Sequence, residues 1–229
     1  MQVRRRLDYD LAMNDFGNTF LLVYAGLFPI VNPVGGAPIF LALTHHHSVE
    51  VRRSLAWRVA VNGFVLLLGS LFVGSHVLAF FGITLPVVRI AGGLAVASFG
   101  WRLLRDGAAG ADDRNEAHQA TAADAFYPLT MPLTVGPGSI AVAIALGAER
   151  PPEATGIFDL ALLASGACVG LVAIAVTIFV CYRFADRMVS VLGVSGINVM
   201  IRLSAFILLC IGIQIIWSGY SALTGLPHH

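Results

Sequence analysis

Charged side chains are scarce in this chain of 229 residues. Asp, Glu, Lys and Arg make up 12% of the chain and hydrophobic residues 57%, and the mean hydropathy is +0.81. Soluble domains carry about 25% charged residues. Lysine is absent, so all fourteen basic residues are arginines, and the formal net charge is +1. This composition excludes a basic face for nucleic acid and predicts that lipid is the main solvent of the protein.

Cysteines and central carboxylates are also scarce. The three cysteines are an odd number and have no CxxC spacing, which excludes a disulfide framework. No Asp or Glu lies centrally in an apolar run, and Asp15, Asp124 and Asp159 lie at the edges, so no carboxylate proton relay is visible. The chain has no HExxH motif and no nucleophile with a plausible base. We therefore expect no enzyme activity, no cofactor and no metal site.

Long apolar runs are abundant, by contrast. Crossing the hydrocarbon core of a bilayer takes about 20 residues in a helix, and lipid leaves helices as the way to satisfy backbone polar groups. Six spans are predicted: Phe16–Thr44, Leu55–Phe81, Thr84–Leu104, Ala125–Leu146, Ile157–Arg183 and Ser195–Leu223. The sequence thus predicts an all-α membrane protein with six transmembrane helices, forming a single transmembrane domain over residues 1–229.

The chain contains an internal repeat. Phe28–Pro33 recurs as Tyr127–Pro132, with an aromatic residue and two prolines shifted by 99 positions. Repeat one covers about residues 16–104 and repeat two about 125–223, separated by the polar segment Arg105–Asp124, which we interpret as a solvated linker. Because each repeat has an odd number of spans, the two repeats enter the membrane from opposite sides. Such inverted-topology repeats are typical of transporters that work by alternating access.

Arginines predict the orientation, because positive residues favour the cytoplasmic loops. Eight lie after the first, third and fifth predicted spans: Arg52, Arg53, Arg58, Arg102, Arg105, Arg114, Arg183 and Arg187. The opposite side has Arg4, Arg5, Arg6 and Arg150. We therefore expect a multi-pass protein with both termini periplasmic.

Each repeat has proline and glycine inside its first span, in Asn32–Pro38 and in Pro132–Ser139. Proline removes an N–H donor and glycine permits unusual backbone angles, so the first and fourth helices are predicted to be broken. Unwound backbone at membrane depth must face the protein interior, and the N-terminal end of the next half-helix suits a carboxylate. The residues predicted to line a substrate site are Asn32, Pro33, Gly35, Gly36, Thr130, Gly136, Pro137, Gly138 and Ser139. The alternative is that these prolines and glycines only kink or pack the helices.

Arg89 and Arg202 lie several residues inside apolar helices. A charge there is costly unless it reaches the headgroups, pairs, or lines a cavity. We expect these arginines either to extend to the headgroups or to act in gating or as a scaffold. Gly166 and Gly170 form a small-xxx-small pair that indicates close helix packing.

The motifs Asn32–Pro38, Arg89–Gly93 and Pro132–Ile140 together resemble those of the MarC family of six-helix membrane proteins, which includes the SnatA-type transporters of small neutral amino acids. The similarity covers about residues 16–220. The resemblance implies a bacterial inner membrane protein that carries glycine or alanine and couples to a proton or sodium gradient.

Together with the repeat, this resemblance implies a secondary transporter of small neutral amino acids, with proton or sodium as coupling ion and the lipid bilayer as its surroundings. The alternative is a MarC-type membrane protein without transport activity, acting as a partner or stress-related component. Whether the chain forms a homo-oligomer is left open.

Overall fold

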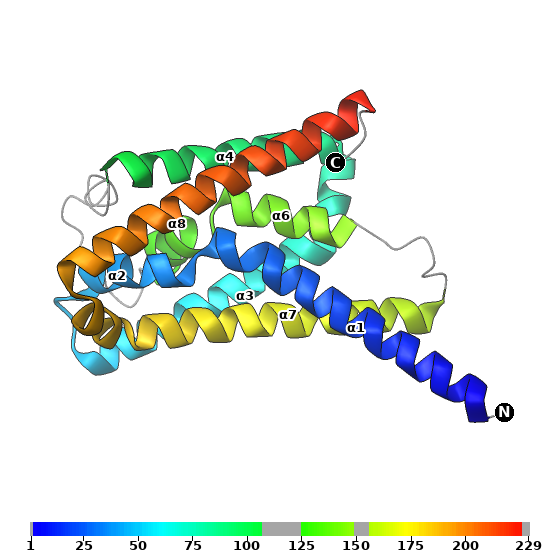
Figure 1. Ribbon diagram of the computed structural model, residues 1–229, viewed down its shortest axis with the longest axis horizontal. Helices are drawn as coiled ribbons and strands as arrows, with labels where there is room; N and C mark the ends of the chain where they lie inside the picture. Colours follow the sequence, from blue (N-terminus) through cyan, green and yellow to red (C-terminus); the bar gives the residue numbers. More distant parts are fainter. Residues whose placement is uncertain (1, 107–124, 149–155, 226–229) are drawn as a thin grey trace.

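A computed structural model describes residues 2–106, 125–148 and 156–225, which contain helices and no strand (Figure 1). The elements are α1 (Gln2–Val31), α2 (Pro33–Thr44), α3 (Val49–Phe80), α4 (Leu85–Asp106), η2 (Phe126–Thr134), α6 (Pro137–Ala148), α7 (Ile157–Arg183) and α8 (Ala185–Thr224). The described chain is therefore all-helical, as predicted.

Several of these helices are long and apolar enough to cross a membrane. Among the described residues there are four: α3, α4, α7 and the part of α8 from Asn198 to Thr224. Asp15–Val31 and Pro33–Thr44, bent by 40° relative to each other, make a fifth if they are one broken span. The α6 helix is apolar but has only 12 residues. The chain is thus a multi-pass membrane protein, and the sixth span stays a prediction.

Helix ends extend beyond the predicted spans. The α3 helix begins at Val49, ahead of the predicted Leu55, because the Ser48 hydroxyl caps it by accepting the Val51 N–H at 3.4 Å. The α8 helix begins ten residues before the predicted start at Ser195 and bends at Gly193, whose φ is 63°. Hydropathy marks the hydrocarbon-spanning part of a helix, whereas hydrogen bonding continues past it. The predicted linker lies outside the described residues, except for its first two residues, which end α4.

Helices α4 and α8 lie antiparallel along much of their length (Figure 1). A Cβ on Gly93 would lie 2.7 Å from the Gly212 carbonyl oxygen, and one on Gly100 would lie 2.7 Å from the Leu209 nitrogen. The two backbones therefore touch, which is the contact that small residues permit between helices in lipid.

The small-xxx-small pair of α7 packs against α1, which confirms its predicted role. A Cβ on Gly166 would lie 2.8 Å from the Phe16 carbonyl oxygen, and one on Gly170 would lie 3.1 Å from the Val23 Cβ. These glycines let α1 and α7 approach closely.

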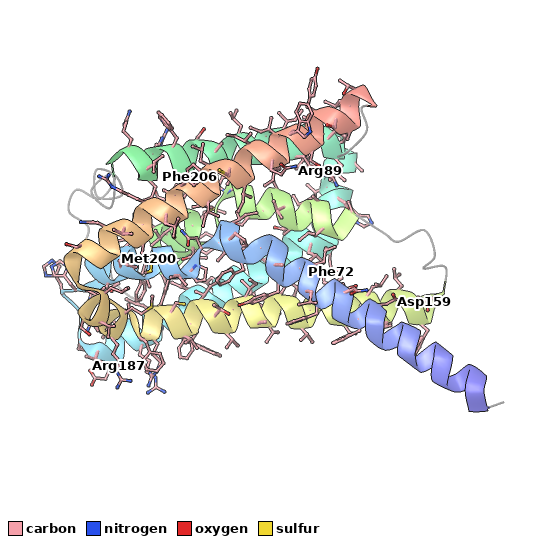
Figure 2. The ribbon with its side chains drawn as sticks, viewed as in Figure 1. Phe72, Arg89, Asp159, Arg187, Met200 and Phe206 are labelled. Atoms are coloured by element: carbon pink, nitrogen blue, oxygen red, sulfur yellow. The ribbon has the colours of Figure 1, made fainter. Side chains whose placement is uncertain are left out.

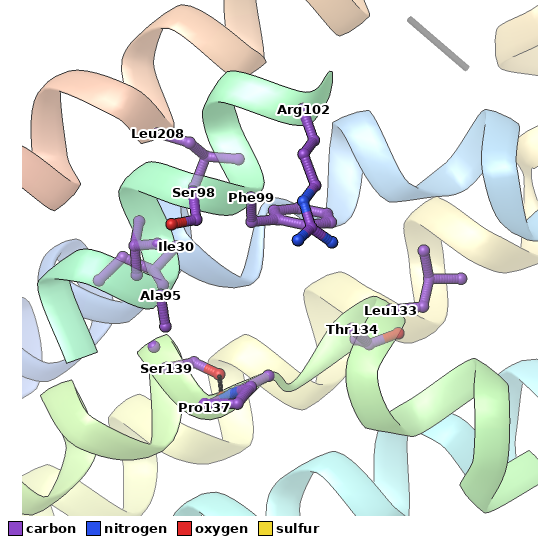
Figure 3. A pocket seen from close by; sticks show the side chains of 13 residues that line it. Ile30, Ala95, Ser98, Phe99, Arg102, Leu133, Thr134, Pro137, Ser139 and Leu208 are labelled. Carbon is purple, nitrogen blue, oxygen red and sulfur yellow. Dashed lines mark hydrogen bonds between the residues drawn. The ribbon is translucent and has the colours of Figure 1, made fainter. Parts of the chain in front are cut away.

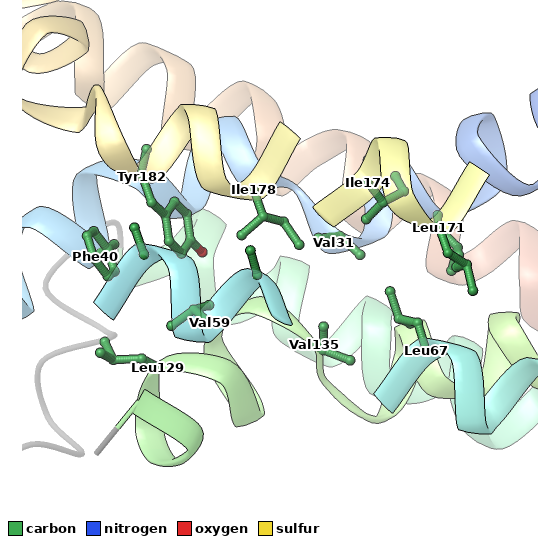
Figure 4. Close-up of a cluster of buried hydrophobic side chains, with 14 of the residues drawn as sticks. Val31, Phe40, Val59, Leu67, Leu129, Val135, Leu171, Ile174, Ile178 and Tyr182 are labelled. Carbon is green, nitrogen blue, oxygen red and sulfur yellow. The ribbon is translucent and has the colours of Figure 1, made fainter. Parts of the chain in front are cut away.

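The larger of two apolar clusters among the described residues packs α1, α2, α3, η2, α6 and α7 against one another (Figure 4). Its fully buried members include Leu129, Val135 and Ile178. Large apolar side chains also face outward, such as Val73, which is 55% exposed, and Leu203, which is 58% exposed. In lipid such exposure costs nothing, because the surroundings are as apolar as the side chains.

Candidate functional site

The first broken helix is interrupted at one residue, Asn32. Its backbone is in the left-handed region, with φ 46° and ψ 56°, and Pro33 has no N–H to continue the helix. The Asn32 side-chain oxygen accepts the Gly35 N–H at 3.2 Å, and its carbonyl accepts the Gly36 N–H at 2.9 Å. Asn32 therefore ends α1 and caps α2 at the predicted position.

The second break is wider. In η2, Tyr127 and Met131 have non-helical backbone angles, and Val135 is extended, with φ −120° and ψ 96°, before α6 begins. The Thr130 hydroxyl donates to the carbonyl five residues before it at 2.6 Å, and the Thr134 hydroxyl does the same at 2.8 Å. The irregular backbone thus begins several residues before the predicted segment, because threonine hydroxyls supply partners to freed carbonyls.

A tyrosine of α7 connects the two breaks. The Tyr182 hydroxyl and the Thr134 hydroxyl are hydrogen-bonded at 2.8 Å. Gly36 of α2 is so near that a Cβ there would lie 2.6 Å from the same tyrosine oxygen. Tyr182 is 3% exposed, and its ring stacks on Phe40 with 4.5 Å between centroids. The side chain of Tyr182 thereby joins α2, η2 and α7 at one point.

A cavity of about 290 Å³, here called the junction cavity, lies at the second break (Figure 3). Its lining comes from α1, α4, η2, α6 and α8: Ile30, Ala95, Val96, Ser98, Phe99, Arg102, Leu133, Thr134, Gly136, Pro137, Gly138, Ser139 and Leu208. The volume is at the lower end of the range for small-molecule sites, about 300–1,000 Å³.

The polar groups of the junction cavity favour an anion. Arg102 reaches from α4 toward the break, and the first turn of α6 contributes Gly138 and Ser139 (Figure 3). The first N–H groups of a helix have no partner in a preceding turn and carry partial positive charge. The Ser139 hydroxyl donates to the Gly136 carbonyl at 2.9 Å, which leaves its oxygen able to accept. A carboxylate placed here would meet a guanidinium and a helix N-terminus.

The predicted site residues fall into separate groups. Gly136, Pro137, Gly138 and Ser139 line the junction cavity. Those of the first break, Asn32, Pro33, Gly35 and Gly36, do not line it. Thr130 is fully buried in η2 and accepts the Asn62 side-chain N–H at 3.4 Å, and it does not line the junction cavity.

The two predicted gating arginines do not line the junction cavity. Arg89, near the start of α4, is partly buried, and a Cβ on Gly219 of α8 would lie 3.0 Å from the Arg89 Cβ. Arg202 is exposed on α8. Their role in gating or as a scaffold stays a prediction.

Sequence reasoning missed Arg102 and Tyr182. In the sequence Arg102 serves only as one of the arginines that predict orientation, but Ala95, Phe99 and Arg102 are four and three residues apart and so share one helix face. That spacing could have assigned Arg102, which is exposed, to the face of α4 that lines the cavity. Tyr182 carries no such signal, because tyrosine is common at the ends of transmembrane helices.

A second and larger cavity of about 950 Å³, here called the distal cavity, lies between α1, α3, α6 and α7. Its polar lining residues are Asp15, Asn18, Thr19, Ser75 and His76. The junction cavity is lined by the last turns of α4, and the distal cavity by the first turns of α7. Figure 1 places these helix ends at opposite ends of the molecule.

Comparison with known proteins agrees with this architecture. The family model of the MarC family integral membrane proteins matches residues 17–224, which include both breaks and the junction cavity. The chain belongs to the MarC family. The UPF0056 inner membrane protein MarC of Salmonella typhimurium is 32% identical over 206 residues, covering 84% of this chain and 90% of that protein.

Other MarC relatives come from distant organisms. A UPF0056 membrane protein of Pyrococcus abyssi is 30% identical over 209 residues, covering 91% of this chain and 97% of that protein. A UPF0056 membrane protein of Buchnera aphidicola is 28% identical over 213 residues, covering 93% of this chain and 96% of that protein. No solved structure matches the chain.

Proposed function

We propose that this MarC family protein is a secondary transporter that moves a small neutral amino acid, such as glycine or alanine, by alternating access. The observation that carries the proposal is the junction cavity, where a broken helix presents its first turn beside Arg102. We also propose an inner membrane location, since the Salmonella relative is named an inner membrane protein, and coupling to a proton or sodium gradient.

The cavity suits a small zwitterion. The substrate carboxylate would accept from Arg102 and from the first N–H groups of α6, while the ammonium group would donate to the Thr134 and Ser139 hydroxyl oxygens. Val96 lies so close to Gly138 that a Cβ on that glycine would collide with it. This close packing limits the space for a substrate side chain and favours the smallest amino acids.

The packing of the helices supports an inverted repeat. The α1 helix packs on α7 and η2 packs on α3; likewise α2 packs on α7 and α6 on α3, and α2 packs on α8 and α6 on α4. If the two repeats are interchanged, so that α1, α2, α3 and α4 take the places of η2, α6, α7 and α8, the first contact of each pair becomes the second. The α4–α8 and α3–α7 contacts stay the same under this interchange. A pseudo-two-fold relation between halves is the basis of alternating access in other inverted-repeat transporters.

Uptake by proteoliposomes tests the proposal. We expect labelled glycine or alanine to accumulate under an imposed proton or sodium gradient. Arg102→Gln should lower kcat/KM by about 10-fold to 100-fold, the equivalent of losing one charged hydrogen bond of about 1.5–3 kcal/mol. Arg105→Gln is the matched control, because Arg105 belongs to the same helix but does not line the cavity. The transport proposal would be contradicted if neither gradient drove accumulation, or if the two variants lowered kcat/KM equally.

A further inference from the structure

A third cavity, of about 230 Å³, lies where α3 begins and where α7 turns into α8. We call it the arginine pocket, because Arg52, Arg53, Arg183 and Arg187 line it. Figure 2 shows Arg187 at the end of the molecule opposite Asp159. The pocket belongs to neither the junction cavity nor the distal cavity.

Among the described residues, the charges that line the arginine pocket do not balance one another. Asp186 is the one carboxylate among its lining residues, and it pairs with Arg52 at 3.2 Å. The Asp186 side chain is 54% exposed and that of Arg52 is 16% exposed, so this pair forms one wall of the pocket. Three guanidinium groups therefore remain without a carboxylate inside the pocket.

An aromatic ring positions two of these arginines. The guanidinium carbons of Arg183 and Arg187 lie 5.5 Å and 5.4 Å from the centre of the Phe184 ring. Contact with a ring face holds a guanidinium in place without neutralising its charge. Its N–H edges therefore stay able to donate to an anion, and guanidinium groups match the oxygens of a phosphate in pairs.

The surroundings of the pocket are apolar. The floor contains Phe40 and Tyr182, which are buried, and the rim contains Val49, 66% exposed, and Phe184, 37% exposed. The pocket lies at the ends of α3 and α7, two of the helices long and apolar enough to span a membrane. An anion bound here would have its charge at the headgroup level and apolar surface beside it, which is the arrangement of a phospholipid.

We propose that the arginine pocket binds the phosphate group of an anionic phospholipid. Basic pockets between transmembrane helices recognise such headgroups. The proposal does not depend on the proposed transport activity.

The test uses the full chain purified in detergent and measures thermal unfolding with phosphatidylglycerol, phosphatidylcholine or inorganic phosphate added. We expect phosphatidylglycerol to raise the melting temperature by several degrees more than the other two additives. The double variant Arg53→Gln/Arg187→Gln removes two exposed arginines, so it should fold normally and lose most of that extra shift. Arg105→Gln, which removes a charge at the same end of the molecule (Figure 1), should keep it.

Native mass spectrometry gives a second measurement on the same samples. We expect phosphatidylglycerol to remain bound to the wild-type chain and to bind the double variant at least 10-fold more weakly. Equal stabilisation by phosphatidylcholine, or by inorganic phosphate, would overturn the proposal. So would a double variant that binds phosphatidylglycerol as tightly as wild type.

Discussion

The Tyr182 hydroxyl lies between the two broken helices, since it is hydrogen-bonded to Thr134 and lies close to Gly36. We expect Gly36→Ala to destabilise the protein by about 1–3 kcal/mol, because the new methyl group must displace a well-packed ring. Tyr182→Phe removes the atom that the methyl group meets, and the next ring atoms are 3.4 Å away. The cost of Gly36→Ala should therefore be smaller in a Tyr182→Phe background, as measured by chemical unfolding in detergent.

Tyr182→Phe alone is the control for this pair. It should cost about 1 kcal/mol, because Thr134 keeps its hydrogen bond to the Leu129 carbonyl oxygen at 2.8 Å. If Gly36→Ala lowers the free energy of unfolding equally in both backgrounds, the tyrosine hydroxyl is not the contact that the new methyl group disturbs.

The capping residue Asn32 gives a second prediction about a single residue. Its φ of 46° is unfavourable for most side chains, and its side chain caps α2. Asn32→Ala should lose the cap and strain the backbone, at a cost of about 1–2 kcal/mol for each. Asn32→Gly should cost less, because glycine adopts the left-handed region freely. Thermal unfolding of both variants would compare them, and an equal loss in both would exclude backbone strain as the cause.

Local chemistry explains which site residues the sequence could predict. The break at Asn32 follows from the adjacent proline, and the cavity residues Gly136 to Ser139 follow from proline and glycine near the start of a helix. Arg102 and Tyr182 join the site through contacts between helices distant in sequence. The amino-acid sequence of a single span does not determine which other helices it contacts.

Helices α1 and α7 provide a prediction at the scale of elements. Gly166→Val should separate their backbones and destabilise the protein by about 1–3 kcal/mol, because the Phe16 carbonyl oxygen occupies the space. Gly69→Ala in α3 is the control, since no atom lies within 4 Å of a Cβ there. That change should be neutral or stabilising by up to about 1 kcal/mol through helix propensity. Both are measurable by unfolding in detergent, and a neutral Gly166→Val would exclude close α1–α7 packing.

The helices themselves could be predicted far better than their ends. Apolar runs located α3, α4 and α7, because lipid selects for hydrophobic length. The starts of α3 and α8 could not be placed, since Ser48 and Gly193 act through hydrogen bonding and backbone angle, which hydropathy does not record.

The two cavities at opposite ends give a prediction for the whole molecule. Ser98 lines the junction cavity and Ser75 the distal cavity. In a variant without its three native cysteines, Ser98→Cys and Ser75→Cys should both react with a membrane-impermeant maleimide, each from its own side. Under alternating access, glycine should change the two labelling rates in opposite directions. Changes in the same direction for both would argue against exchange between two states.

The backbone contact between α4 and α8 has a mechanical consequence. Gly93 lies against the Gly212 carbonyl and Gly100 against Leu209. Shifting α4 by one residue would place Phe99 or Trp101 where Gly100 lies, with a large side chain against the α8 backbone. This contact opposes sliding, so we expect the pair to move as a unit that includes one helix from each predicted repeat. Spin labels on α4 and α8 should keep a constant separation while the protein works, and the displacement should come from α2 and α6 turning about Asn32 and Val135.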